Sequence, residues 1–302
     1  MHSMDGDWPL ERKTPVIGGH EGAGIIVTLG SMVTEHEVGD KVGVKWLNSS
    51  CMDCTFCMSA DEPLCPKAQL SGYTVDGTFQ QYTVANAAHV ARLPKDADLA
   101  AIAPILCAGL TAYKALKESQ ARPGQYVAIV GAGGGLGSFA LQYAKAMGLQ
   151  PIGIDAGSSK GESCRKLGAT AYVDFTVAKS VPDDVRAATH DGLGPHAVLL
   201  LTEQDKPFRQ AISYVRSRGS IVCIGMADTS VGLPIFDAVT RMVSVKGSYV
   251  GSRLDTQEAV GFFRRGKIEA PYKLVGLSEL EKVFELMREN KITGRYVLDM
   301  SR

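Results

Sequence analysis

Four cysteines stand close together in the first third of the chain, and their spacing is typical of a metal site. Cys51, Cys54, Cys57 and Cys65 form the pattern C-x2-C-x2-C-x7-C. The surrounding segment, residues 48–66, has few apolar side chains, so we expect metal ligation to supply its folding free energy. Four thiolates complete the tetrahedral coordination that Zn²⁺ prefers and leave no position for a substrate. The pattern predicts a structural zinc site. An iron–sulfur cluster, which uses similar cysteine spacings, is the alternative.

A glycine-rich stretch, VAIVGAGGGLGS at residues 127–138, is the second candidate for chemistry. It is typical of a strand, a tight turn and a helix start, where backbone N–H groups and the helix dipole bind a pyrophosphate. GAGGGLG carries one residue more than the pattern G-x-G-x-x-G, so the stretch alone is a weak signal. The residues expected to contact a dinucleotide here are Gly131, Gly134, Gly135, Leu136 and Gly137.

An acidic residue follows this stretch at the distance that dinucleotide binding requires. Asp155 ends the next strand-like run, IGID. A carboxylate at this point accepts both ribose hydroxyls of NAD and repels the 2′-phosphate of NADP. Lys160 lies a little further on, and we expect it to cover the adenosine ribose or to be an exposed surface lysine. The sequence therefore predicts NAD binding; a helix-packing glycine turn with an exposed aspartate is the alternative.

The elements that must position these residues show two patterns of predicted secondary structure along the chain. Short strand-like runs at 24–30, 40–46 and 79–94 precede a helix that Asp98 caps and that Pro104 ends or kinks. From Tyr126 onward, apolar strands alternate with helices that we expect to end at Gly148, Gly168 and Gly219. This alternation predicts an α/β fold with a doubly wound parallel sheet, a Rossmann domain. We assign residues 106–246 to it, and residues 1–105 with 247–302 to a β-rich domain.

Composition excludes several classes of protein. The 302 residues contain 32 Lys and Arg and 32 Asp and Glu, and a net charge of zero argues against a nucleic-acid partner. With 45% hydrophobic residues the chain can bury a large core, and it has no uninterrupted apolar run long enough to cross a membrane. No export signal is recognised, so we expect the seven cysteines to be reduced and the protein to be cytoplasmic.

Taken together, these motifs resemble the zinc-dependent, medium-chain alcohol dehydrogenases of the fungal, yeast-like type, whose catalytic domain is GroES-like. The resemblance covers nearly the whole chain. Besides the cysteines, it rests on GGHEGAG (18–24), LSGYTVDGTFQQY (70–82), APILCAGLTAYKALK (103–117), GAGGGLGSFALQYAKAMG (131–148), GSYVGSRLDTQEA (247–259) and GRYVLDM (294–300).

The resemblance implies a second, catalytic zinc with His20 and Cys107 as ligands. Glu21 matches a carboxylate that can approach this metal, and Trp8 and Trp46 match aromatic walls that restrict the pocket to small primary alcohols. Further residues that would lie near the cofactor are Phe175, Ile224, Met226, Ser248, Val250 and Arg295. The family also carries a C-H-T-D-L-H motif just before the GDWP found here at residues 6–9.

Aligned in this way, Met1 and His2 take the last two places of that motif, and the fold is N-terminally incomplete. The family's third zinc ligand, a cysteine, then has no match, and Glu21, Asp5 or His2 would substitute. An incomplete gene sequence and a truncated remnant both explain this. The remaining histidines, which are His36, His89, His190 and His196, have no evident partners and are predicted to be incidental. Cys164 and Cys223 are predicted to be core or surface thiols.

The sequence thus predicts an NAD-dependent enzyme that interconverts small primary alcohols and aldehydes, with two zinc ions. A non-catalytic NAD-binding remnant with one structural zinc is the alternative. A zinc-free quinone or enoyl reductase would need neither the four cysteines nor His20 with Cys107, and a polyol dehydrogenase fits the two tryptophans less well. The resemblance also implies a homotetramer built partly through the inserted domain.

Overall fold

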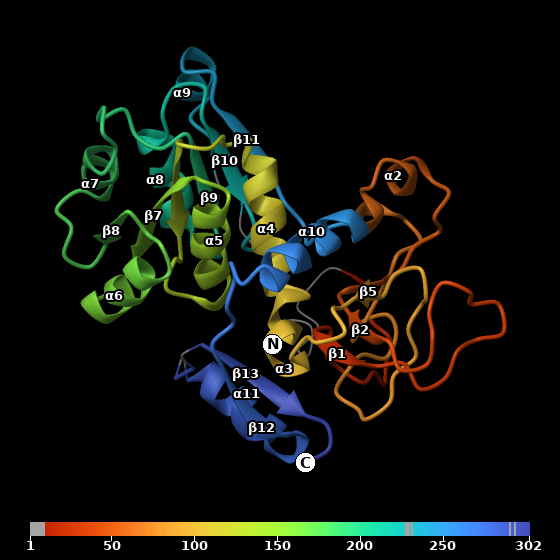
Figure 1. Ribbon diagram of the computed structural model, residues 1–302. Helices are drawn as coiled ribbons and strands as arrows, with labels where there is room; N and C mark the ends of the chain where they lie inside the picture. The colour runs from red at the N-terminus through yellow and green to blue at the C-terminus, as the bar shows by residue number, and fades with distance from the viewer. Residues whose placement is uncertain (1–9, 227–229, 231, 290, 293) are drawn as a thin grey trace. The chain divides into compact units, whose positions relative to one another are not determined.

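The structure is a computed structural model that describes residues 10–226, 230, 232–289, 291–292 and 294–302. Its chain divides into two compact units (Figure 1). The terminal unit joins Met1–Leu110 with Val250–Arg302, and the inserted unit is Thr111–Tyr249. The sequence-based boundaries, after residues 105 and 246, compare with divisions after residues 110 and 249 in the structure.

The inserted unit is built on a six-stranded sheet with the order β11-β10-β9-β6-β7-β8. All neighbouring strands run parallel. The chain builds outward from β6 to β8, then returns to the other side of β6 and builds outward from β9 to β11, which confirms the predicted doubly wound topology. The strands are β6 (Tyr126–Val130), β7 (Gln150–Asp155), β8 (Ala171–Asp174), β9 (Ala197–Leu200), β10 (Ser220–Cys223) and β11 (Ser244–Gly247).

Helices cover this sheet, and its central strands are closed to water. Ile129, Ile152 and Leu199 are fully buried, as expected when both faces of a parallel sheet are covered. Helix α5 packs on β6 and β7, α6 on β7 and β8, and α8 on β9 (Figure 1). The helices are α5 (Gly135–Ala146), α6 (Ser158–Lys166), α7 (Val181–Ala187), α8 (Asp205–Tyr214), α9 (Ile235–Thr240) and α4 (Ala108–Ser119), which begins in the terminal unit.

Two of the three predicted glycine helix ends are confirmed. Gly148 and Gly168 follow α5 and α6 with φ of 77° and 115°, a left-handed conformation that glycine adopts without strain. The prediction for Gly219 is wrong. Helix α8 ends at Tyr214, and the residue with positive φ in the following turn is Arg218, at 61°.

The described residues of the terminal unit form three small sheets. Strands β1 (Gly22–Ile25), β2 (Lys41–Val44) and β5 (Ala91–Arg92) pair antiparallel, as do β3 (Leu47–Ser49) and β4 (Gln69–Leu70). Strands β12 (Tyr272–Gly276) and β13 (Arg295–Asp299) pair parallel. The helical elements are α2 (Thr55–Met58), η1 (Glu62–Leu64), α3 (Leu99–Ile102), η2 (Ala103–Ile105), α10 (Arg253–Arg264), η3 (Leu277–Glu279) and α11 (Leu280–Arg288).

One predicted strand of this unit is wrong and one predicted cap is confirmed. Only Ala91–Arg92 of residues 79–94 forms a strand; Asn86 instead accepts the N–H of Ala88 in a local turn. A short polar side chain that bonds its own backbone in this way competes with strand pairing. Asp98 caps α3 by accepting the N–H groups of Ala100 and Ala101, and Pro104 lies in the 3₁₀ turn where α3 ends.

Among the described residues, no single helix is both long and apolar enough to cross a membrane. One bent pair, Leu99–Ile105 with Ala108–Ser119, meets the length and composition criteria together.

Candidate active site and metal centres

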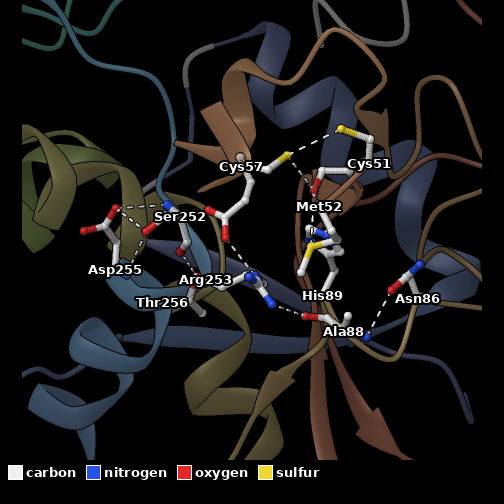
Figure 2. Close-up of polar contacts among 12 residues, drawn as sticks. Cys51, Met52, Cys57, Asn86, Ala88, His89, Ser252, Arg253, Asp255 and Thr256 are labelled. Carbon is white, nitrogen blue, oxygen red and sulfur yellow. Dashed lines mark hydrogen bonds and ion pairs between the residues drawn. The ribbon is translucent and has the colours of Figure 1, made fainter. Parts of the chain in front are cut away.

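The four cysteines of the zinc loop come together in the terminal unit as predicted. Their sulfur atoms all lie within 4.8 Å of one another. Three of the separations are 3.5 Å (Cys54–Cys57), 3.6 Å (Cys51–Cys65) and 3.9 Å (Cys51–Cys57). A tetrahedron of sulfurs about 2.3 Å from a zinc ion has edges of about 3.8 Å. The four thiols therefore fit a structural zinc ion; Figure 2 shows Cys51 and Cys57.

The surroundings of Cys51 and Cys54 shift the pKa values of their thiols in opposite directions. The N–H groups of Asp53 and Cys54 directed at Cys51 lower the pKa of its thiol to about 6. For Cys54, the N–H of Cys57 lowers the pKa, but desolvation and the neighbouring thiols outweigh it and raise the value to about 11. The thiols of Cys51 and Cys54 therefore do not ionise together by themselves. A divalent cation among them supplies the charge that four thiolates need.

The predicted catalytic residues lie at a glycine turn that a second segment holds in place. The turn is Ile17–His20, and backbone N–H groups of Gly77, Thr78 and Phe79 donate to the carbonyls of Ile17, Gly19 and Gly18 at 2.7, 3.1 and 2.9 Å. A Cβ on Gly77 would lie 2.0 Å from the Gly19 carbonyl oxygen, so only glycine permits this approach. Sequence reasoning gave Gly77 no role, although it stands inside the quoted motif LSGYTVDGTFQQY.

His20 is half-buried against Trp46. The two rings meet edge to face, with centroids 4.9 Å apart and an interplanar angle of 74°. Trp46 is only 5% exposed and packs in turn against Tyr73, so it fixes the orientation of the imidazole. Burial lowers the pKa of His20, and Glu21 opposes this only in part. A neutral imidazole is the form that binds a metal ion.

Glu21 connects the histidine turn to the cysteine that should share its metal. Its Oε1 accepts a hydrogen bond of 2.9 Å from the backbone N–H of Ala108, the first residue of α4. Cys107 precedes this residue directly, and the contact satisfies one of the N–H groups that a helix start leaves without an intrahelical partner. The hydrogen bond thus joins the residue that follows His20 to the residue that follows Cys107, although the two are 87 residues apart in the sequence.

The structure brings the other predicted residues together only in part. Among the described residues, the zinc loop is the one cluster of three or more potential metal ligands, so His20, Glu21 and Cys107 form no second one. Trp8 lies outside the described residues, as do Met1, His2 and Asp5. Assignment of these residues to a catalytic centre therefore remains a prediction.

The glycine-rich loop of the inserted unit leaves β6 and enters α5, as the sequence predicts. Gly131 has φ of 83°, and its N–H bonds the Ile154 carbonyl at 2.9 Å. A Cβ on Gly137 would lie 2.2 Å from the Gly131 oxygen, so glycine is required where the helix crosses the loop. Gly134 is the residue before α5, where no side chain caps the helix, so its first N–H groups can receive a pyrophosphate.

Asp155 ends β7 and faces this loop. Its Oδ2 accepts the N–H of Gly133 at 2.8 Å, and its Oδ1 accepts the Lys160 ammonium at 2.8 Å and the N–H of Ala156 at 2.7 Å. The residue is 7% exposed, whereas 51% of the Lys160 side chain is exposed. A carboxylate offers about four acceptor positions, so Asp155 retains capacity for a ribose hydroxyl. Lys160 is an ion-pair partner here rather than an isolated surface lysine.

Other predicted cofactor residues lie at the carboxyl edge of the same sheet, where ligands of doubly wound folds bind. Phe175 follows β8 and is 50% exposed; Ile224 follows β10 and is buried. Met226 lies two residues further and is exposed. Ser248 follows β11, and its buried Oγ has no hydrogen-bond partner among the described residues. Val250 and Arg295 belong to the terminal unit, so their role at the cofactor remains a prediction.

The prediction that four histidines lack partners is wrong for three of them. His36 contacts the Ala87 carbonyl at 3.1 Å, His196 accepts the N–H of Tyr126 at 3.2 Å, and His89 contacts Ser50 Oγ at 3.1 Å. Cys164 is a buried core thiol, as predicted, and Cys223 is half-buried.

Comparison with known proteins matches both units. Residues 135–265 match the zinc-binding dehydrogenase family, and residues 1–95 match the alcohol dehydrogenase GroES-like domain. Alcohol dehydrogenase 1 of Neurospora crassa is 64% identical over 303 aligned positions, which cover 100% of this chain and 86% of that protein. The chain belongs to the zinc-dependent alcohol dehydrogenase family. This confirms the resemblance that the motifs indicated.

Further relatives agree with this membership. Alcohol dehydrogenase 1 of Emericella nidulans is 56% identical, over 99% of this chain and 86% of that protein. The crystal structure of the alcohol dehydrogenase from the archaeon Aeropyrum pernix has a TM-score of 0.89 and 29% identity, covering 98% of this chain and 87% of that one. The predicted architecture, a Rossmann domain with a GroES-like domain, is therefore the fold of this family.

Proposed function

We propose that this chain interconverts small primary alcohols and aldehydes, with NAD as the hydride carrier and a catalytic zinc ion held by His20 and Cys107. The observation that carries the proposal is the hydrogen bond from Ala108 to Glu21, which joins the positions adjacent to both ligands. Membership of the zinc-dependent alcohol dehydrogenase family and the identity to two proteins named Alcohol dehydrogenase 1 support it.

Residues of the terminal unit have three roles in this proposal. When bound, zinc supplies a Lewis acid that lowers the pKa of an alcohol oxygen, and NAD supplies the hydride acceptor. Burial keeps His20 neutral, and Trp46 fixes the orientation of its ring. The imidazole can therefore bind zinc without losing a proton or rotating. Glu21 anchors the start of α4 beside Cys107. Trp46 also supplies a large, rigid wall that limits the size of the substrate.

Residues of the inserted unit orient the dinucleotide. The first residues of α5, Gly135–Gly137, direct backbone N–H groups at a pyrophosphate, and Asp155 accepts a ribose hydroxyl. A 2′-phosphate at this carboxylate would bring two negative charges together, which favours NAD over NADP. Lys160, bonded to Asp155, lies where it can donate to the same ribose.

A non-catalytic NAD-binding protein with one structural zinc is the second candidate. The observation in its favour is that only the zinc loop forms a cluster of three or more ligands among the described residues. The number of zinc ions bound per chain distinguishes the two functions. Two zinc ions support the enzyme, and one supports this alternative.

We also propose a homotetramer, since apolar side chains are exposed beside the edge strand of the inserted unit. Phe236, Val239 and Val245 are 79%, 68% and 45% exposed in α9 and β11. An edge strand flanked by exposed apolar groups is a surface that pairs with another chain. Sedimentation of the protein and of Phe236→Asp tests this; an unchanged mass in the variant argues against this surface.

A cytoplasmic location is the remaining part of the proposal. None of the seven cysteines forms a disulfide, which is the state that reducing compartments maintain. Imaging of the tagged protein in fungal cells tests the location.

The activity itself is tested by following NADH formation with primary alcohols of increasing length. We expect zinc-dependent turnover that falls as the alcohol lengthens, and a shift toward longer alcohols in Trp46→Leu. No turnover of any of these alcohols by the zinc-loaded protein would refute the proposed activity.

A further inference from the structure

A cavity of about 690 Å³ lies in the terminal unit beside the zinc loop. Its wall contains no residue predicted to bind the catalytic zinc or the cofactor. It is formed by residues 35–36, by Lys45, by part of the zinc loop, by residues 87–92 and by the start of α10. Figure 2 shows two of its polar side chains, His89 and Arg253, with the contact of Arg253 to the Ala88 carbonyl. The cavity is independent of the proposed dehydrogenase activity.

Two cations and one carboxylate that are buried or half-buried meet in this wall, and Glu35 and Arg92, which are exposed, also line the cavity. Lys45 and Glu62 are each only 2% exposed, and Arg253 is half-buried. Arg253 Nε donates to Glu62 Oε1 at 2.7 Å, and its Nη1 makes a long contact of 3.4 Å with the Ala88 carbonyl. One carboxylate thus faces two positive groups. A positive charge that is closed off from water, as that of Lys45 is, is costly unless an anion compensates it.

Three buried atoms of this wall have no hydrogen-bond partner among the described residues. They are Lys45 Nζ, Glu62 Oε2 and His89 Nδ1. The ammonium is a donor only, and the carboxylate oxygen is an acceptor only. Burial lowers the pKa of Lys45 to about 8 and that of His89 to about 4, so the imidazole is neutral at pH 7. Lys45 Nζ therefore lacks an acceptor, and Glu62 Oε2 lacks a donor.

A ligand that completes this wall must be an anion and must also carry a proton to donate. Inorganic phosphate meets both conditions at neutral pH, because it keeps at least one P–OH group. Sulfate is fully ionised and would place a bare oxygen against Glu62. A phosphomonoester, with its second pKa near about 6, has mostly lost its P–OH group at pH 7. Lysine, with its flexible stem, can turn its ammonium into the cavity.

We propose that this cavity binds inorganic phosphate, with Lys45 and Arg253 donating to its oxygens and Glu62 Oε2 accepting its P–OH group. The bound anion balances the second cation, and the carboxylate selects phosphate over sulfate. Because Glu62 lies in the 3₁₀ turn Glu62–Leu64, directly before Cys65, the phosphate also reinforces the zinc loop.

Calorimetric titration of the zinc-loaded chain at pH 7 with phosphate, sulfate and glycerol phosphate tests this proposal. We expect saturable binding of phosphate, and binding of sulfate and of the ester weaker by at least about 100-fold, since buried polar groups left unpaired discriminate strongly. Equal affinity for phosphate and sulfate, or no saturable heat with phosphate, would overturn it. These measurements need no variant, so a folding defect cannot obscure them.

Substitutions then test the roles of Lys45 and Glu62 in phosphate binding, after the zinc content of each variant has been confirmed. Lys45→Met should abolish the rise of the unfolding temperature with phosphate, while Lys95→Met, at an exposed lysine outside the cavity, should keep it. Glu62→Gln supplies an N–H donor, so sulfate should now bind about as well as phosphate. Retention of the phosphate effect in Lys45→Met, or of the preference over sulfate in Glu62→Gln, would contradict the assignment.

Discussion

Glu21 Oε1 accepts a 2.9 Å hydrogen bond from the backbone N–H of Ala108, and this contact spans 87 residues of sequence. Glu21 follows His20, and Ala108 follows Cys107, so one carboxylate relates the positions of both proposed zinc ligands. The bond also places negative charge at the start of α4, where the helix dipole stabilises it. In the proposed function, Glu21 therefore acts on the catalytic zinc through the backbone beside both proposed ligands.

Glu21→Ala should weaken the catalytic zinc more than Glu21→Gln does. The glutamine retains an oxygen that can accept the Ala108 N–H, whereas alanine leaves that group without the acceptor. Loss of a residue that orients metal ligands costs about 10–100-fold in metal affinity or activity. Competition with a chelator and the rate of NADH formation measure this. Equal losses of zinc affinity and of NADH formation in the two variants would show that the hydrogen bond to Ala108 does not stabilise the zinc site.

Cys57→Ser should remove the structural zinc and destabilise the terminal unit. Apparent binding free energies of structural zinc are about 10–16 kcal/mol in small zinc domains, and much of this folds the loop. We expect the metal content to fall by one zinc per chain, together with a lower unfolding temperature. Cys223→Ser, at a half-buried thiol outside the loop, is the control and should keep the metal. A full zinc complement in Cys57→Ser would contradict the site.

Asp155→Ala should raise the KM for NAD and reduce the preference over NADP. Hydrogen bonds to charged groups contribute about 1.5–3 kcal/mol, which corresponds to about 10–150-fold in binding. The variant also releases Lys160, which can then approach a 2′-phosphate. Steady-state kinetics with both cofactors measure the ratio, with Asp191→Asn as a control in a surface ion pair. An unchanged ratio would exclude Asp155 from ribose recognition.

The sequence predicted the inserted unit well because its strands and helices repeat locally. Each strand is apolar, each helix follows it, and Gly148 and Gly168 mark two of the helix ends. Residues 79–94 were mistaken for a strand because their side chains alternate. In the structure the Asn86 side chain instead accepts the backbone N–H of Ala88, and only Ala91–Arg92 pairs with β2.

The contacts that complete the sites join residues far apart in the chain, and spacing alone cannot show them. Glu62 and Arg253 form an ion pair across 191 residues. Gly77 was not recognised because the need for glycine arises from the backbone of Gly19, which approaches it. A lysine inside the apolar run KVGVKW was the available signal for the cavity, since a buried lysine needs a partner.

Lys45 should make the stability of the protein depend on pH between about 8 and 10.5. Burial lowers its pKa from 10.5 to about 8, so the unfolded chain binds more protons than the folded one in this interval. The free energy of unfolding therefore rises with pH there, because the cost of the buried charge, present below pH 8, disappears. Urea unfolding in phosphate-free buffer, compared with Lys45→Met, measures it. Parallel pH profiles of the two proteins would contradict this.

Zinc content measured together with alcohol oxidation in His20→Ala and Cys107→Ala tests the central claim most directly. We predict two zinc ions per chain in the parent protein, and one in each variant, with the zinc loop still occupied. NADH formation should fall by at least about 1000-fold, because removing a metal ligand removes the Lewis acid. Two zinc ions and undiminished NADH formation in either variant would show that these residues do not hold the catalytic metal.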